Sequence, residues 1–176
     1  MLIGLISDTH IPDRAKELPE KVFESFENVD IILHAGDVTS TEVLDKLGEI
    51  APVIAIQGNT DRYVGLELPK SEIVEANGIK IGLVHGEVYP RADTQQLLYL
   101  AKQLGVNILV SGHSHQPKIE QVEDVLLLNP GSPTIPRLAD RTVMILEVFE
   151  DKNIEVELIK VGSPVCSTLD FSRFKH

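Results

Sequence analysis

The feature that most constrains this 176-residue chain is a set of five short apolar runs, each of which stops at a polar motif. Short β-branched runs of this kind predict strands that are covered on both faces. The motifs that follow them are Asp8-Thr9-His10, His34-Ala35-Gly36-Asp37, Gly58-Asn59-Thr60-Asp61, His85-Gly86 and Ser111-Gly112-His113-Ser114-His115. Because α/β sheets bind ligands beyond the carboxyl ends of their strands, we expect these motifs to converge on one site.

The first third of the chain alternates strand and helix patterns. Residues 2–7, 30–33 and 52–57 are predicted strands, and helices are predicted over 19–27 and 40–50. A strand–helix–strand–helix–strand order implies crossover connections and therefore a parallel sheet.

The pattern then changes. Asn77-Gly78 separates two apolar segments, 72–76 and 80–84, and predicts a β-hairpin. A helix is predicted over 94–104, ended by Gly105 in a left-handed conformation, and a strand over 107–110. The remaining strands, predicted to form a largely antiparallel meander, are 119–122, 125–128, 142–149 and 154–161.

These elements together predict an α/β fold in which two mixed β-sheets pack face to face and are flanked by helices, as a four-layer α-β-β-α sandwich. The length suits one domain that buries enough surface to need no disulfides. We place this domain at residues 1–164 and a C-terminal tail at 165–176, because the pattern weakens after Pro164.

Charge and cysteine content exclude several classes of function. The formal net charge is −11, from 16 basic and 27 acidic residues, which argues against double-stranded nucleic acid or an anionic membrane as a partner. The single cysteine, Cys166, suits a reducing compartment. Neither a signal peptide nor an apolar run of membrane-spanning length is evident, so the expected location is the cytoplasm.

The spacing of the polar residues suggests a metal site. Asp8 and His10 are two residues apart, as are His113 and His115, and such pairs point to the same side of an extended backbone. Carboxylate, amide and imidazole donors together suit Mn²⁺, Fe²⁺, Zn²⁺ or Ni²⁺, and Mg²⁺ less well. Seven such side chains are too many for one tetrahedral ion, but they suit two ions that share a carboxylate.

The motifs D-x-H, G-D-x, G-N-x-D, H-G and G-H-x-H occur in this order, and the chain resembles the calcineurin-type metallophosphoesterase superfamily in carrying them. The segment NPGSPTIPR, residues 129–137, resembles the small YfcE-type phosphodiesterase branch most closely. The resemblance extends to about Val161. It implies a metallophosphoesterase-like fold, and each motif is weak alone but specific in this order.

Residue by residue, the resemblance assigns Asp8, His10 and His115 to one metal ion, and Asn59, His85 and His113 to the other, with Asp37 bridging the two. It implies a dinuclear centre, with Mn²⁺ as the expected metal, in which a bridging hydroxide attacks phosphorus. Two divalent ions, two carboxylates and the hydroxide leave a net charge of about +1, which favours a phosphate substrate in an acidic protein. Asp37 and Asn59 are therefore also the expected catalytic residues.

One residue departs from the superfamily pattern. Thr60 stands where many members carry a histidine that is thought to assist the leaving group, so activated leaving groups should react best. His34 is the nearest unassigned histidine. It is a candidate either to hydrogen-bond a metal ligand or to act as a substitute acid. The candidate substrate-binding residues are Arg14, Arg137 and Ser132, although a solvated surface role is the simpler interpretation of either arginine.

The expected function is a divalent-metal-dependent phosphohydrolase, and a phosphodiesterase more than a monoesterase, acting on a small phosphoester. One alternative is a protein-interaction scaffold, because a eukaryotic retromer subunit uses the same fold in this way. A regulatory phosphoprotein phosphatase is a third interpretation, disfavoured by Thr60 and by the lack of long insertions. A homo-oligomer is left open, with Leu169–Phe174 as a candidate subunit contact.

Overall fold

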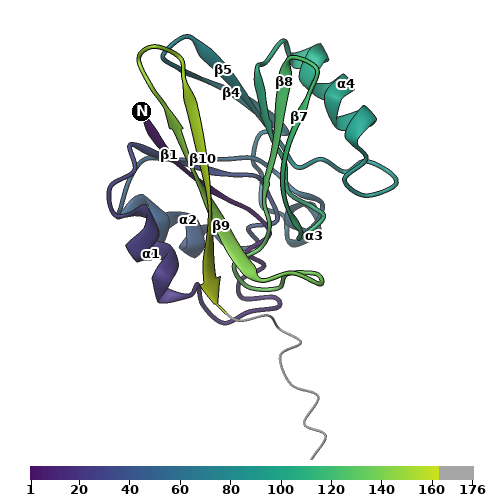
Figure 1. Ribbon diagram of the computed structural model, residues 1–176. Helices are drawn as coiled ribbons and strands as arrows, with labels where there is room; N and C mark the ends of the chain where they lie inside the picture. Colours follow the sequence, from purple (N-terminus) through teal and green to yellow (C-terminus); the bar gives the residue numbers. More distant parts are fainter. Residues whose placement is uncertain (163–176) are drawn as a thin grey trace, which may run out of the picture.

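The computed structural model describes residues 1–162 and has two five-stranded sheets packed face to face (Figure 1). The strand order is β10-β9-β1-β2-β3 in the first sheet and β4-β5-β6-β8-β7 in the second. The strands are β1 (Leu2–Ile6), β2 (Ile31–His34), β3 (Val53–Ala55), β4 (Ser71–Ala76), β5 (Ile79–Val84), β6 (Ile108–Val110), β7 (Pro117–Val122), β8 (Val125–Pro130), β9 (Arg141–Val148) and β10 (Ile154–Gly162). The helices are α1 (Glu20–Phe26), α2 (Thr41–Gly48), α3 (Asn59–Val64) and α4 (Thr94–Leu104).

The first sheet confirms the predicted parallel unit. β1 pairs in parallel with β2, and β2 pairs in parallel with β3, with α1 and α2 as the intervening helices. β9 and β10 extend this sheet on the other side of β1 as an antiparallel hairpin. The central strand β1 is therefore paired on both sides, which leaves its carboxyl end in the middle of the sheet edge.

The predicted antiparallel meander of β7 to β10 is wrong in part, because its two hairpins lie in different sheets. β4–β5 and β7–β8 are antiparallel hairpins as expected, but β5, β6 and β8 run parallel to one another. β8 does not lead into the next strand of its own sheet, because β9 pairs with β1 of the first sheet. The pairing within each hairpin depends on residues close in sequence, whereas the sheet that a hairpin joins depends on strands far away in sequence.

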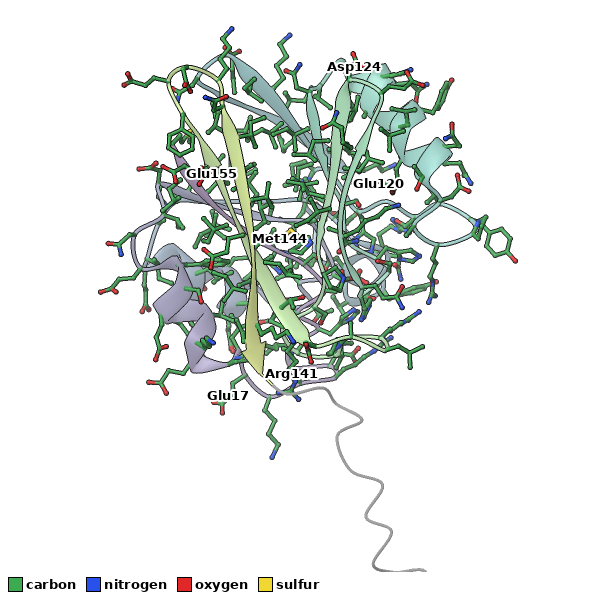
Figure 2. All side chains as sticks on the ribbon, in the orientation of Figure 1. Glu17, Glu120, Asp124, Arg141, Met144 and Glu155 are labelled. Carbon is green, nitrogen blue, oxygen red and sulfur yellow. The ribbon has the colours of Figure 1, made fainter. Side chains whose placement is uncertain are left out.

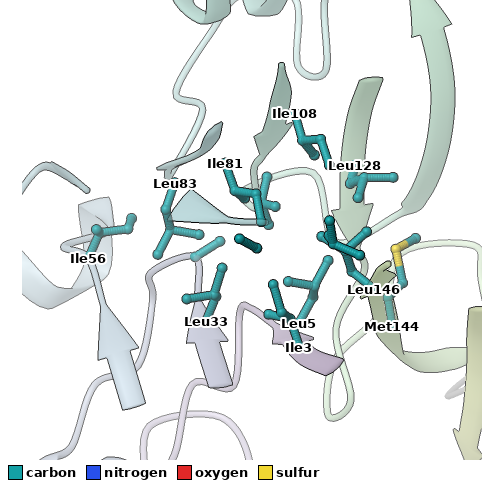
Figure 3. Packing of buried hydrophobic residues seen from close by; sticks show 14 residues of the cluster. Ile3, Leu5, Leu33, Ile56, Ile81, Leu83, Ile108, Leu128, Met144 and Leu146 are labelled. Atoms are coloured by element: carbon teal, nitrogen blue, oxygen red, sulfur yellow. The ribbon is translucent and has the colours of Figure 1, made fainter. Parts of the chain in front are cut away.

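A shared apolar core lies between the two sheets (Figure 3). Ile3, Leu5 and Leu33 from the first sheet face Ile81 and Leu83 from the second, and all five side chains are fully buried. The hydrophobic effect of such burial contributes about 1.5–3 kcal/mol for each large aliphatic side chain, so this layer stabilises the arrangement of both sheets together.

Helices cover the outer faces of both sheets, which completes the four layers (Figure 1). Successive residues of β9 alternate between the two sides: Val143 packs with the α1 and α2 layer, and Met144 packs between the sheets. On the second sheet, α4 contributes Leu97, Leu98 and Ala101 to a separate outer cluster. Burial on both faces explains why the strands are continuous apolar runs.

Acidic side chains such as Glu17, Asp124 and Glu155 lie on the outside of the molecule (Figure 2). Among residues 1–162, no helix is long and apolar enough to cross a membrane. Cys166, the candidate contact Leu169–Phe174 and the whole predicted tail, 165–176, fall outside the described residues.

Candidate metal centre

The five polar motifs meet at one edge of the sandwich, as predicted. They follow the carboxyl ends of β1, β2 and β3 in the first sheet and of β5 and β6 in the second. The seven predicted ligands form two groups of side chains, and the carboxylate of Asp37 lies next to both.

The first group consists of Asp8, His10, Asp37 and His115, and each of the four is buried. One ligand atom from each residue lies within 4.8 Å of those of the other three. His10 Nε2 is 3.3 Å from Asp37 Oδ2, and His115 Nε2 is 3.4 Å from Asp8 Oδ1. Two carboxylates and two imidazoles therefore face one point in the interior.

The second group consists of Asn59, His85 and His113. Asn59 Oδ1 lies 3.2 Å from His85 Nε2 and 3.1 Å from His113 Nδ1. His85 Nε2 also lies 3.4 Å from Asp37 Oδ2, the same oxygen that His10 approaches. Asp37 therefore lies next to both groups.

The donor set and its spacing fit divalent cations. Metal–ligand bonds of about 2.0–2.2 Å place neighbouring ligand atoms roughly 3.0–3.5 Å apart. The individual atom pairs given above, at 3.1–3.4 Å, fall in that range. Within residues 1–162, neither ring nitrogen of His10 has a hydrogen-bond partner, although both are buried. A buried imidazole without a hydrogen bond is costly unless a ligand satisfies it, which makes His10 a candidate metal ligand.

The backbone reaches this arrangement differently from the prediction. Extended backbone was expected to align Asp8 with His10 and His113 with His115, but all four residues have positive φ angles, between 46° and 67°. Asp37 shares this conformation, with φ of 56°. Left-handed backbone costs about 1 kcal/mol or more for a residue with a side chain, and such strain concentrates at functional sites.

Glycines admit the close approach of these loops. A Cβ atom on Gly58 would overlap the backbone nitrogen and carboxylate of Asp37, and one on Gly112 would lie 2.8 Å from Asp8 Oδ2. The glycines of both motifs are therefore required sterically at the site.

Short helix α3, which the sequence analysis did not predict, orients Asp37. The Thr60 backbone N–H donates to Asp37 Oδ1 at 2.7 Å, and the Thr60 hydroxyl donates to Oδ2 at 3.0 Å. Asp61 is fully buried, and its carboxylate accepts the backbone N–H groups of Asp37, Thr39 and Gly58 at 2.7–2.9 Å. No role was predicted for Asp61, although an acidic residue three positions after a helix-capping glycine is a capping signal.

Backbone carbonyls set the orientation of two histidines. His85 Nδ1 donates to the carbonyl of Ala35, and His115 Nδ1 donates to the carbonyl of Ile135, both at 2.8 Å. Each bond directs the other ring nitrogen, Nε2, toward the ligand groups. Such outer contacts fix the tautomer of a metal-binding histidine.

The ionisation of the cluster follows from burial and from its two carboxylates. Burial lowers the pKa of His10 to about 4 and raises the pKa of Asp8. Burial acts in the same direction on Asp37, but the hydrogen bond and charge of His85 hold its pKa below the usual range. Despite its own burial, His85 has its pKa raised to about 9 by Asp37 and Asp8. A proton on His85 thus balances Asp37 when no cation does, so cations and protons compete here.

The 129–137 segment braces the ligand loops. Asn129 Nδ2 donates to the carbonyl of Gly112 at 2.8 Å, and Thr134 Oγ1 donates to the carbonyl of Thr9 at 2.8 Å. Ser132, a candidate substrate contact, is fully buried and its hydroxyl donates to the carbonyl of Asp8 at 2.8 Å. Its hydroxyl therefore supports the Asp8 loop, and the expected substrate contact of Ser132 stays a prediction.

The remaining predicted residues lie around the two groups. His34 is fully buried and its Nε2 lies 3.1 Å from the Thr9 hydroxyl, and burial lowers its pKa to about 3. A histidine held neutral out of contact with solvent suits the predicted supporting role, and not that of a substitute acid. Arg14 is exposed and pairs with Asp13 at 3.3 Å, while the backbone N–H of half-buried Arg137 donates to the carbonyl of His115.

Residues 1–151 match the family described as the calcineurin-like phosphoesterase superfamily domain. The chain belongs to that superfamily. This match covers every predicted metal ligand and both sheets except for β10. The superfamily resemblance inferred from the five motifs is therefore confirmed.

Relatives and solved structures agree with this assignment. A probable metallophosphoesterase of Methanothermobacter thermautotrophicus is 56% identical over 173 residues, covering 98% of this chain and 100% of the relative. A crystal structure of wild-type Vps29 complexed with Zn²⁺ from Entamoeba histolytica has a TM-score of 0.74 at 27% identity, covering 92% of this chain and 100% of its own. A conserved uncharacterised protein of Streptococcus pneumoniae, described as a predicted phosphoesterase, has a TM-score of 0.73 at 26% identity, covering 96% and 94%. This phosphoesterase fold confirms the predicted architecture.

Proposed function

We propose that the protein is a phosphodiesterase that hydrolyses small phosphoesters at a two-ion centre formed by the seven predicted ligands. The observation that carries this proposal is the position of Asp37 Oδ2, 3.3 Å from His10 Nε2 and 3.4 Å from His85 Nε2. One carboxylate oxygen between two imidazoles, each from a different ligand group, is what a pair of ions sharing a bridge requires. Membership of the superfamily supports the same interpretation.

The chemistry is divided between the cations and the protein. Two divalent ions, with Mn²⁺ our first choice and Ni²⁺, Zn²⁺, Fe²⁺ or Mg²⁺ as the others, would neutralise phosphate charge and lower the pKa of the attacking water. The protein supplies the carboxylates that hold this charge in place and the loops that orient them. Thr60 and Asp61 restrain Asp37, and the carbonyls of Ala35 and Ile135 restrain the histidines. Rigid placement of this kind reduces the reorganisation that the reaction requires.

We expect aryl diesters to react faster than alkyl diesters. The Thr60 hydroxyl donates to Asp37, so that it is already committed and is not free to protonate a leaving oxygen. The nearest further histidine, His34, is fully buried. Without a general acid, a leaving group that is stable as an anion has the advantage. Arg14 and Arg137 stay our candidates for contacts with the substrate's phosphate.

A metal-reconstitution assay tests this function. The protein is stripped with a chelator and reloaded with each metal, bound ions are counted, and activity is measured on bis(p-nitrophenyl) phosphate, p-nitrophenyl phosphate and cyclic nucleotides. We expect about two ions per chain and the highest turnover on the aryl diester. A protein that binds two ions yet cleaves none of these esters would refute the proposal.

The second candidate function is a protein-interaction scaffold. The similarity to Vps29, the kind of eukaryotic retromer subunit considered in the sequence analysis, favours this alternative. The complete set of seven ligand side chains favours the enzyme instead. A stable protein partner that co-purifies with metal-loaded but inactive protein would favour the scaffold.

A further inference from the structure

We propose that a cavity beside His85 binds the ester group that stays on phosphorus, and that it selects a planar group of nucleoside size. This inference rests on the phosphodiesterase activity proposed above. It names the class of substrate, which the metal ligands alone do not specify.

The cavity lies beside His85, one member of the second ligand group. Its volume is about 450 Å³, and His85 and Gly86 form part of its wall. His85 Nε2 is 3.2 Å from Asn59 Oδ1, so the cavity adjoins the position where we place phosphate. Small-molecule sites commonly have volumes of about 300–1,000 Å³, which leaves room here for a ring system and a sugar.

The far wall of the cavity is largely apolar and comes mainly from α4. Leu100 and Leu104 of this helix line it together with Val84 and Val88. Tyr99 also lines it and is 64% exposed, so that its side chain is accessible to a ligand. An accessible aromatic ring above an aliphatic wall favours a planar group, because stacking stabilises any base or aryl ring.

The charges of the cavity are nearly balanced. Arg62 donates from both terminal nitrogens to the two carboxylate oxygens of Glu87, at 2.8 and 2.6 Å, which pairs two of the lining charges. Lys70 adds one positive charge, and Gln103 and Ser71 offer polar groups to the edge of a ring. This lining suits an uncharged ring attached to one phosphate better than a second polyanion.

The geometry of displacement indicates which ester group enters the cavity. In-line attack at phosphorus sends the leaving group directly away from the attacking oxygen, while the retained ester projects to the side. His85 belongs both to the cavity wall and to the second ligand group. On this ground we assign the cavity beside His85 and Tyr99 to the retained ester.

Three diesters with one leaving group test this assignment. The p-nitrophenyl esters of thymidine 5′-phosphate, phenyl phosphate and methyl phosphate differ only in the retained group. Tyr99→Ala should lower kcat/KM for the thymidine ester roughly tenfold, because the stacking face is lost, and leave the methyl ester within twofold of wild type. Tyr99→Phe should keep the wild-type preference, and Tyr63→Ala, at an exposed tyrosine outside this cavity, should change neither substrate. The phenyl ester should lie between the two if ring stacking and polar edge contacts both contribute.

The outcomes separate this inference from the proposed function. Equal kcat/KM values for the thymidine and methyl esters, or an equal loss on both in Tyr99→Ala, would overturn the cavity assignment and leave the phosphodiesterase intact. If no diester is cleaved, the function fails, and calorimetry with thymidine 5′-monophosphate and methyl phosphate decides on the cavity. Tighter binding of the nucleotide that Tyr99→Ala abolishes would then support the cavity, and equal binding would refute it.

Discussion

The two ligand groups differ in charge and in access to solvent. Asp8, His10, Asp37 and His115 are all buried and bring two carboxylates to one point. The second group adds only neutral donors of its own, because Asn59 contributes an amide, and both Asn59 and His113 are half-buried. The first group is therefore anionic and enclosed, whereas the second has only neutral donors of its own when a cation is bound and is partly open to solvent at Asn59 and His113.

This difference suggests a division of labour within one centre. Enclosed carboxylates hold a cation strongly, because the surrounding protein screens the attraction less than water does. An open group of neutral donors holds its cation less strongly and leaves more room for phosphate. We therefore expect the first group to anchor the centre and the second to receive the substrate. Four measurements test this contrast.

The largest effect should come from Asp37→Asn, because it removes the charge that the two groups share. We expect kcat/KM on an aryl diester to fall roughly a thousandfold or more, since charge stabilisation at a metal centre is worth several kcal/mol. Bound metal should fall below two ions per chain, while the far-ultraviolet circular dichroism spectrum stays unchanged. Asp45→Asn, at an exposed residue of α2, is the matched control and should behave as wild type. Full activity of Asp37→Asn at saturating metal would contradict the shared bridge.

Stepwise removal of metal compares the two groups directly. As chelator is added, one ion should leave well before the other, and His113→Ala should lack the weakly held ion while His10→Ala should lack the tightly held one. Mass spectrometry of the native protein counts the ions at each chelator concentration. Loss of both ions in one step, in wild type and in both variants, would show that the groups do not differ.

Asp61→Asn tests the support beneath the shared carboxylate without removing a ligand. Asp61 accepts three backbone N–H groups, and an amide of the same shape replaces one acceptor oxygen with a donor. We expect activity and metal affinity to fall about 10–100-fold, the usual effect of changing a group that orients a ligand. Asp124→Asn, at an exposed residue beyond β7, serves as control. Wild-type metal affinity in Asp61→Asn would show that Asp37 needs no such restraint.

The smallest effect concerns how the free energy of unfolding depends on pH through His34, which is buried near the first ligand group. The pKa of His34 is about 3 in the folded chain against an ordinary 6.5, so below pH 6.5 the unfolded chain binds a proton that the folded chain does not. Stability is therefore lost as pH falls, by about 2 kcal/mol between pH 7 and pH 5 for this residue alone. Urea unfolding in chelator should show a shallower pH dependence for His34→Gln than for wild type. Equal slopes would mean that the pKa of His34 is the same in the folded and unfolded chains.

Much of the site could be predicted from the sequence, because each ligand follows a strand whose pattern is local. Asp8 comes directly after an apolar run, and so does His85, and the carboxyl ends of parallel strands meet at one edge. The supporting residues were harder to predict. Asp61 and Ser132 look like ordinary loop residues until their partners are known, and the partner of the Ser132 hydroxyl is 124 residues away.

The failed part of the fold prediction has the same cause. Periodicity identified α4 with both of its ends correct and the Asn77-Gly78 hairpin, since hydrogen bonds between near neighbours define them. It did not show that β6 would lie in parallel between β5 and β8, or that β9 would join β1 in the other sheet. It also missed α3, whose six residues are too few to show a helical period.

The sequence alone therefore determined most of the elements, the candidate metal donors and their order along the chain, because these depend on side-chain type and local spacing. Tertiary structure decided the strand order, the left-handed backbone at Asp8, His10, Asp37, His113 and His115, and the cavity beside His85. These features arise only when segments far apart in sequence pack together. Backbone strain at the ligands, in particular, persists only where such packing offsets its cost.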